Sequence, residues 1–361
     1  MAKLDAFFRV VVEQDASDMH LAVGSPPVLR IRSVLKKVDY PPLTEEVLRP
    51  MLYEILTERQ IEEFERTHDL DFSYSATGIA RFRVNFYMKH TGIAAAFRLI
   101  PFRIPTLDEL GAPPVLKQMC EFRNGLVLVT GPTGSGKSTT LAAMIHHINQ
   151  NNHEHILTLE EPLEFVHTPI KCMISQREIG THTESFAKGL VAALHEDPDV
   201  VLVGEMRDLE TIQLAITAAE TGHLVFGTLH TNNASKTVDR IIDVFPADHQ
   251  AQVRTMLSES LRGVISQQLL RRADNSGRVA AFEVLVATPA VRALIREQKT
   301  FQIPSIIATS RKEGMQTLDQ ALLNLALNKV ITPEEALRFA DAPATLLGKL
   351  PFQQGLVGDR Q

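Results

Sequence analysis

The sequence predicts an α/β protein in which a parallel sheet covered by helices follows a smaller α+β domain. From about residue 115 onward, apolar runs alternate with helical patterns, which is typical of βα units and a parallel sheet. A glycine-rich loop lies between one apolar run and a helix-forming stretch. Proline concentrates at 99–114, where the pattern changes. We therefore expect domains at 1–98 and 115–345, a hinge at 99–114 and a C-terminal tail at 346–361.

Composition limits the classes of function. A chain of 361 residues is long enough for two domains with a core each. The net charge of −6 gives no support for nucleic acid as the main partner. Cys120 and Cys172 lie far apart and outside any C-x-x-C pair, which argues against a disulfide framework or a cysteine zinc site and fits a reducing cytoplasm. No uncharged apolar run reaches the roughly 18 residues of a spanning helix, so membrane association is expected only through a partner.

The first domain has alternating segments at 28–34 and 81–87, which predict strands of an antiparallel sheet mixed with short helices. It contains no nucleotide motif. Arg81 and Arg83 share one face of a strand by their spacing of two, and Arg98 lies on the last strand-like segment before the hinge. These arginines are candidates for neutralising charge on a transferred phosphate, and a solvated sheet face is the alternative.

The second domain has predicted strands at 126–130, 155–160, 200–204 and 224–229, with helices at 183–195 and 208–221. From residue 251 onward the pattern is mostly helical, with one further strand expected at 279–286. The final helix is expected to start at Thr332, with Pro333 in its first turn and Glu335 as a capping-box partner.

The loop at 131–138 reads GPTGSGKS and joins a predicted strand to a predicted helix. This arrangement directs backbone N–H groups and the positive end of the helix dipole at one point, which suits a nucleotide phosphate. Gly134 and Gly136 leave the backbone bare enough for close approach. Lys137 is expected to reach the β- and γ-phosphates, and the Ser138 hydroxyl is expected to hold Mg²⁺.

Ligands of open parallel sheets bind beyond the carboxyl ends of the strands. Glu205 closes the segment VVLVGEMRD, where an acidic residue is expected to hold Mg²⁺ or its waters. Glu164 follows the strand at 155–160, together with Glu160 and Glu161, and is assigned to positioning the attacking water. His230 is expected to hydrogen-bond the γ-phosphate. For the acidic residues, the alternative is a helix cap or a solvated loop.

His223 and His230 are an odd number of residues apart, so on one strand they would face opposite sides. A metal ion shared by these two histidines is therefore not expected.

Four segments carry a family resemblance. GPTGSGKS, TLEEPLEFVH, EDPDVVLVGEMRD and TAAETGHLVFGTLHT resemble, in order and spacing, the Walker A, Asp, Walker B and His boxes of the secretion and type IV pilus ATPases. Within that family, AVRALIRE at 290–297 and ASDMHL at 16–21 are similar to the twitching-motility (retraction) ATPases. The resemblance runs from about residue 5 to residue 345.

The resemblance implies a PAS-like domain, a RecA-like ATPase domain with the cofactors ATP and Mg²⁺, and a ring-shaped homohexamer that powers pilus retraction. It implies a cytoplasmic location at the inner membrane, with a pilus platform protein as partner and a paralogous retraction ATPase as a further candidate. The implied catalytic residues are Lys137, Glu164, Glu205 and His230. The implied ATP-binding residues are Gly131, Pro132, Thr133, Gly134, Ser135, Gly136, Lys137, Ser138, Thr139, Arg81, Arg83 and Arg98, with Mg²⁺ at Ser138 and Glu205.

The sequence departs from the family pattern at three positions. Glu161 stands where the Asp box usually has aspartate, and His195 and Val191 stand where arginines are common. We expect these changes to tune coupling without abolishing it.

Four alternatives remain at this stage. The chain could be an accessory retraction ATPase, or an assembly or secretion ATPase, although the latter usually carry a four-cysteine zinc insertion and a longer N-terminal region. A non-hydrolysing ATP switch is the alternative from another class. A DNA-translocating motor shares the fold but needs a basic channel, for which the acidic net charge gives no support.

Overall fold

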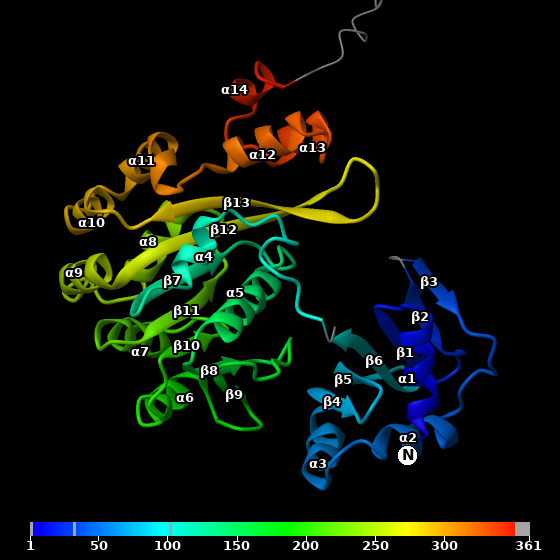
Figure 1. The fold of residues 1–361 in the computed structure, drawn as a ribbon. Coiled ribbons are helices and arrows are strands. Elements are labelled where there is room, and N and C mark those ends of the chain that lie inside the picture. The colour runs from blue at the N-terminus through cyan, green and yellow to red at the C-terminus, as the bar shows by residue number, and fades with distance from the viewer. Residues whose placement is uncertain (1–2, 32–33, 101–102, 351–361) are drawn as a thin grey trace, which may run out of the picture. The chain divides into compact units, whose positions relative to one another are not determined.

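The computed structural model describes residues 3–31, 34–100 and 103–350. They form two compact units (Figure 1). The first unit is Met1–Arg103 with Pro162–Val166, and the second is Ile104–Glu161 with His167–Gln361. The chain therefore leaves the second unit for one short segment and then returns to it.

The N-terminal unit is a mixture of helices and one antiparallel sheet, as expected. Its elements are α1 (Leu4–Glu13), β1 (Asp18–Ala22), β2 (Val28–Ile31), β3 (Val34–Lys37), α2 (Glu45–Tyr53), α3 (Glu58–Thr67), β4 (Asp69–Ala76), β5 (Ala80–Lys89) and β6 (Gly92–Ile100). The six strands lie in the order β3-β2-β1-β6-β5-β4, and each neighbouring pair is antiparallel.

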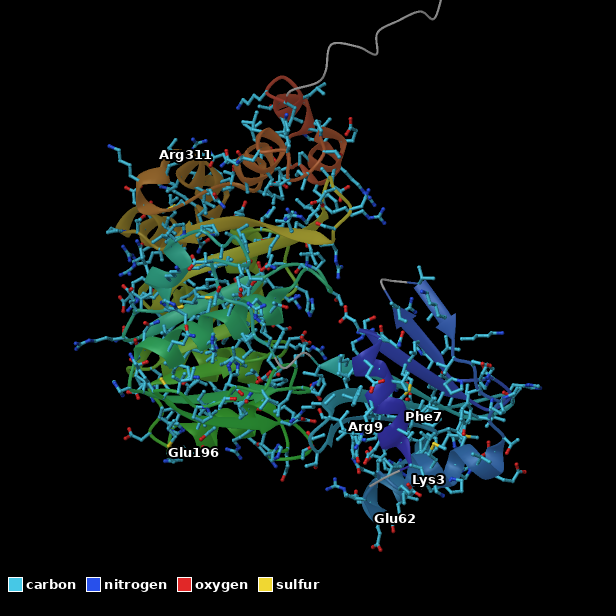
Figure 2. The ribbon with its side chains drawn as sticks, turned by 45° about the vertical axis from the view of Figure 1, so that its right-hand side comes forward. Lys3, Phe7, Arg9, Glu62, Glu196 and Arg311 are labelled. Atoms are coloured by element: carbon cyan, nitrogen blue, oxygen red, sulfur yellow. The ribbon has the colours of Figure 1, made fainter. Side chains whose placement is uncertain are left out.

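Alternation along β5 explains how this sheet acquires one apolar face. Phe82, Val84 and Phe86 are buried, while Arg83 between them is exposed. Phe8 of α1 stacks on Phe82 with ring centroids 4.3 Å apart; Figure 2 labels its neighbours Phe7 and Arg9 on the same helix. Because successive side chains of a strand point to opposite faces, the arginines lie on the face away from this core.

The second unit begins with α4 and contains a seven-stranded sheet. Its elements are α4 (Val115–Met119), β7 (Gly125–Thr130), α5 (Lys137–Asn151), β8 (His155–Glu160), β9 (Met173–Glu178), α6 (Phe186–Ala193), β10 (Val200–Val203), α7 (Leu209–Glu220), β11 (Leu224–Leu229), α8 (Ala234–Asp243), α9 (Gln250–Ser260), β12 (Leu261–Arg271), β13 (Arg278–Val286), α10 (Pro289–Arg296), α11 (Ile303–Thr309), α12 (Leu318–Leu327), α13 (Pro333–Phe339) and α14 (Pro343–Leu347). Short 3₁₀ turns lie at Thr300–Gln302 and Arg311–Glu313.

The strand order of the second sheet is β13-β12-β7-β11-β10-β8-β9. All neighbours from β12 to β9 are parallel, and β13 is an antiparallel edge strand. The four strands expected before residue 251 are present, as are the two expected helices, which form α6 and α7. The predicted parallel α/β architecture is therefore confirmed.

Helices cover both faces of this sheet, as buried parallel strands require. Leu126 and Leu128 of β7 belong to one core, which also contains side chains of α6 to α11. Val127 and Val129 of the same strand belong to the other core, which contains side chains of α4 and α5. Every residue of β7 is buried, so the loop that follows it is anchored in the middle of the domain.

Two strands differ from the sequence-based expectation. The segment after residue 251 was expected to be mostly helical, but α9 passes directly into β12. No turn residue separates them, and the buried polar residues Ser266 and Gln267 interrupt the apolar pattern by which β12 could have been predicted. The edge strand β9 was also not predicted, because Met173 is exposed and the strand has no clear alternation.

Boundaries differ in three places. β6 continues to Ile100, beyond the expected domain end at 98 and into the expected hinge. The expected tail at 346–361 begins too early, because Leu346 and Leu350 are buried; its remainder, 351–361, lies outside the described residues. α13 is capped by Thr332 as predicted, but another helix follows it, and the Glu335 side chain accepts from the Arg271 backbone, 3.0 Å away, instead of closing a capping box.

Candidate active site

The phosphate loop connects β7 to α5 near the centre of the second sheet. Gly131, Gly134 and Gly136 have φ angles of +143°, +78° and +90°. Residues with a Cβ atom rarely adopt such angles. Gly136 is the N-cap residue of α5, so the loop passes from a buried strand directly into a helix start. This order presents loop backbone N–H groups and the positive end of the helix dipole to a ligand.

Two of these glycines also face the neighbouring strand β12. A Cβ atom at Gly131 would lie 2.4 Å from the main-chain oxygen of Gln267, and one at Gly136 would lie 2.8 Å from Gln267 Nε2. A Cβ atom at Gly134 would have no neighbour within 4 Å. Backbone conformation favours glycine at all three positions. At Gly131 there is also no space for a Cβ atom, and at Gly136 a Cβ atom would require the Gln267 amide to shift.

Lys137 is the first residue of α5, and its side chain lies against the loop. Its Nζ atom donates to the carbonyl oxygens of Gly131 and Pro132, at 2.9 and 3.1 Å. Ser138 and Thr139 follow in the first helical turn and are half-buried, whereas Thr133 is exposed.

Ser135 is buried, and its Oγ atom has no hydrogen-bond partner among the described residues. This unpaired hydroxyl, a glycine cradle and an ammonium group in the same loop fit a phosphate group. The nearby Ser138 hydroxyl supplies the hard oxygen ligand that Mg²⁺ prefers.

Glu205 and His230 lie at the ends of two neighbouring strands. β10 pairs with β11 in parallel, with Val203 opposite Gly227, and Glu205 follows in the turn after β10. His230 Nε2 lies 2.9 Å from Glu205 Oε1. β11 pairs on its other side with β7, the strand that leads into the phosphate loop. The loop, His230 and Glu205 therefore follow the carboxyl ends of three adjacent strands, β7, β11 and β10, on the same side of the sheet.

The turn that carries Glu205 is held by packing. The backbone N–H of Met206 donates to Thr228 O at 3.0 Å, and Met206 is buried. A Cβ atom at Gly227 would lie 2.3 Å from Met206 Sδ, so this glycine makes the space for the methionine side chain. Contacts of the neighbouring Met206 with Gly227 and Thr228 of β11 therefore fix the position of the turn that carries Glu205.

Glu205 is held in its ionised form. Partial burial favours the neutral acid, but the hydrogen bond and the charge of Arg207, together with His230, outweigh it and lower the pKa of Glu205. An ionised carboxylate at this position suits a divalent cation or its bound waters. The lowered pKa therefore favours the charge state that the predicted metal-binding role of Glu205 needs.

The end of β8 supplies further acidic residues. Glu160 accepts from Thr158 Oγ1 at 2.8 Å and from Gln176 Nε2 at 3.3 Å, which holds it between β8 and β9. Glu161, the first departure from the family pattern, is exposed, and its charge contributes to raising the pKa of Arg207, after the larger contribution of Glu205.

The remaining predicted site residues belong to the N-terminal unit. Glu164 is exposed and lies in Pro162–Val166. On the sheet, Arg83 is exposed and stands opposite Arg98, whose Nε donates to Asp18 Oδ1 at 2.9 Å, and Arg81 is half-buried. The expectation that these four residues approach the nucleotide stays a prediction.

His223 and His230 flank β11 at its two ends. The Nδ1 atom of His223 lies 3.0 Å from the carbonyl oxygen of Ala218, at the start of β11. Within residues 3–31, 34–100 and 103–350, no three His, Cys, Asp or Glu side chains gather as a metal-binding group. The other two departures, Val191 and His195, are exposed. Figure 2 labels the adjacent Glu196, which accepts from Arg177 Nη1 at 2.7 Å.

Gln267 also contacts the phosphate loop, which was not expected from the sequence. It lies in β12, which was expected to be helical, and its side chain bonds to Ser135 and Thr140 of the loop and helix. A polar pair at Gln267 and Gln268 inside an otherwise apolar stretch was the available signal.

A phosphate loop with an acidic residue after a neighbouring strand suits a nucleoside triphosphate, and this arrangement places the chain among the P-loop ATPases. The particular family follows from the sequence comparison. Residues 2–338 match the family described as Type II/IV secretion system protein, and the chain belongs to that family.

Individual relatives cover nearly the whole chain. It is 51% identical over 331 residues to the Pseudomonas aeruginosa protein named type IV pilus retraction ATPase PilT, and the match covers 92% of this chain and 96% of that protein. It is 53% identical over 314 residues to the Neisseria gonorrhoeae protein named twitching motility protein, with coverages of 87% and 84%. A crystal structure of the pilus retraction motor PilT with bound ADP matches with a TM-score of 0.90 at 45% identity, covering 96% of this chain and 100% of that one.

Proposed function

We propose that this protein is the ATP-hydrolysing motor of type IV pilus retraction, the machinery of twitching motility. The observation that carries the proposal is the phosphate loop with the Glu205–His230 pair at the ends of the next two strands. High identity to a named retraction ATPase over 92% of the chain supports the biological setting.

Each site residue has a role in the proposed reaction. The loop at 131–139 binds the phosphates of ATP through the backbone N–H groups of its residues other than Pro132 and through the Lys137 ammonium. Ser138 and Glu205 would hold Mg²⁺, which neutralises phosphate charge when bound. Glu164 orients the attacking water, His230 contacts the γ-phosphate, and Arg81, Arg83 and Arg98 neutralise charge that develops on the phosphoryl group.

The proposed assembly is a homohexamer at the cytoplasmic face of the inner membrane. Hydrolysis changes the angle between the two domains across the hinge, and the ring transmits this movement to a pilus platform protein. A paralogous retraction ATPase is a further proposed partner, and nucleic acid is not. In the described part of the chain, no helix is both long and apolar enough to span a bilayer.

Phosphate release with Mg²⁺ and ATP tests the enzyme. The purified full chain is compared with Glu205→Ala and Glu164→Ala, and each protein is run on a sizing column with and without ATP. Loss of turnover in both variants with hexamers retained supports the motor. Nucleotide binding without turnover in the unmodified protein would favour the non-hydrolysing switch.

Complementation then tests the biological role. The gene is returned to a bacterium that lacks its retraction ATPase, and single-pilus retraction is measured. Restored retraction supports the main motor. Restoration only when a second retraction ATPase is present favours the accessory role, and failure of pilus formation without this gene favours an assembly ATPase.

A further inference from the structure

Gln267 lies where the phosphate loop meets the neighbouring strand. It follows Ser266, which pairs with Thr130 at the end of β7, and it is 2% exposed. Its side-chain amide uses both ends. Nε2 donates to the carbonyl oxygen of Ser135 at 2.7 Å, and Oε1 accepts from Thr140 Oγ1 at 2.7 Å. One side chain from a distant part of the sequence therefore joins the loop to the first part of α5.

Only one orientation of this amide satisfies both contacts. The carbonyl oxygen of Ser135 can only accept, so the NH₂ group of Gln267 must face it. The amide oxygen then faces Thr140, whose hydroxyl can donate. Because both contacts are buried, loss of either leaves a polar group without a partner, and such groups are costly inside a protein.

The same residue explains why two loop glycines lack space. The main-chain oxygen of Gln267 and its Nε2 atom occupy the positions next to Gly131 and Gly136, respectively. Gly131 and Gly136 therefore both pack closely against Gln267, on the side of the loop that faces β12. The loop conformation, including its positive φ angles, depends on this contact as well as on the glycines.

We propose that Gln267 is a positioning residue of the nucleotide site, which holds the phosphate loop in the form that directs its backbone N–H groups at the phosphates. This inference rests on the proposed nucleotide-binding function. Gln267 acts through Ser135, Gly136 and Thr140 and need not touch the nucleotide. Because ATP and ADP share the phosphates that the loop binds, both nucleotides are expected to lose affinity when the amide donor is removed.

Gln267→Glu is the sharpest test, because it keeps the shape and replaces the NH₂ donor by an oxygen facing Ser135 O. We expect the full-length variant to bind ADP and ATP about tenfold or more weakly at pH 8, the loss typical of a buried polar group left unpaired. Gln268→Glu is the matched control. It makes the same chemical change at the next strand position, opposite Ala281, and is expected to bind like the unmodified protein.

Recovery of ADP binding at low pH distinguishes a role in positioning the loop from a general loss of structure. A glutamic acid at position 267 regains an O–H donor when protonated, and burial raises the pKa of such a group. The ratio of variant to unmodified Kd for ADP is therefore expected to fall as the pH is lowered from about 8 to about 6. Gln267→Leu, which has no donor at any pH, is expected to show no such recovery.

The outcomes are distinguishable. If the unmodified protein binds and hydrolyses ATP while Gln267→Glu binds ADP with unchanged affinity at pH 8, Gln267 is not a positioning residue. If the unmodified protein binds no adenine nucleotide, the proposed function itself is wrong, and this inference with it. Thermal unfolding without nucleotide checks each variant. Should Gln267→Glu fail to fold, Thr140→Val carries the test: a several-fold rise in the Kd for ADP supports the inference, and an unchanged Kd overturns it.

Discussion

His230 Nε2 and Glu205 Oε1 lie 2.9 Å apart, although the two residues end different strands of the parallel sheet. Glu205 also pairs with Arg207, whose side chain is 70% exposed compared with 18% for Glu205. Arg207 belongs to the same turn as Glu205, whereas His230 follows the neighbouring strand, so the contact with His230 is the one that depends on the pairing of β10 with β11. We expect this contact to link the acidic residue of the site to the strand beside the phosphate loop.

His230→Ala is expected to lower kcat about ten- to a hundredfold, while the Kd for ADP changes much less, because the phosphate loop stays intact. Steady-state phosphate release and ADP titration measure the two quantities. His223→Ala, at the opposite end of β11, is the control and is expected to retain activity. An equal loss of ADP affinity and turnover in His230→Ala would argue for a structural role.

Glu205→Gln keeps the size of the side chain but removes its charge. We expect Mg²⁺-dependent phosphate release to fall about a hundredfold or more, and chelation of Mg²⁺ to abolish turnover in the unmodified protein until the ion is restored. ADP binding without Mg²⁺ is expected to change little. Glu210→Gln, an exposed position on α7, is the control. Full activity of Glu205→Gln would exclude Glu205 as the metal-binding acid.

Gly136→Ala tests the space in the loop. The substitution adds a Cβ atom 2.8 Å from Gln267 Nε2 at a φ of +90°, so we expect loss of ADP binding in addition to backbone strain. Gly78→Ala has a similar φ of +74° but no neighbour within 4 Å, so it carries the strain alone. That strain is about 1–2 kcal/mol. Denaturant unfolding and ADP titration of both variants separate the effects, and intact binding in Gly136→Ala would contradict the expected collision.

Glu283 is expected to make the stability of the second unit depend on pH. This buried residue of β13 accepts from the backbone N–H of Ala234 at 2.7 Å. The pKa of Glu283 is raised from its ordinary 4.5 to about 7, mainly by burial. The hydrogen bond from Ala234 lowers this pKa, whereas the negative charges of Asp341 and Asp319 raise it. Because the folded state holds the proton more tightly, the stabilising contribution is complete below an unfolded pKa near 4.5 and is lost as the pH rises through about 7.

Glu283→Gln is therefore expected to match the unmodified protein at about pH 4 and to be about 1–3 kcal/mol more stable at about pH 8. Urea unfolding at both pH values measures this difference. Glu334→Gln, an exposed position, is the control. Unfolding free energies of Glu283→Gln that run parallel to those of the unmodified protein at both pH values would show that Glu283 does not titrate in this range.

Strand prediction succeeded where local pattern and burial agree. β7, β8, β10 and β11 are short apolar runs buried on both faces, and such runs are visible in sequence. β12 was missed because Ser266 and Gln267 are polar yet buried, and Gln267 is satisfied by Ser135 and Thr140, which are distant in sequence. Burial of a polar residue depends on tertiary contacts, so the polar pair at Gln267 and Gln268 could mark an unusual position in the sequence but could not show that Gln267 is buried.

The phosphate-loop prediction came from the sequence, since glycines, Lys137 and Ser138 between a strand and a helix are local features that suit a phosphate group. The sequence also placed Glu205 and His230 after their strands. The pairing of these two side chains could not be predicted from the sequence, because strand order is set by packing of whole strands and not by neighbours in the chain. The tertiary structure likewise decided that Gln267 packs against the phosphate loop, since the two segments are far apart in sequence and meet only when β12 pairs with β7.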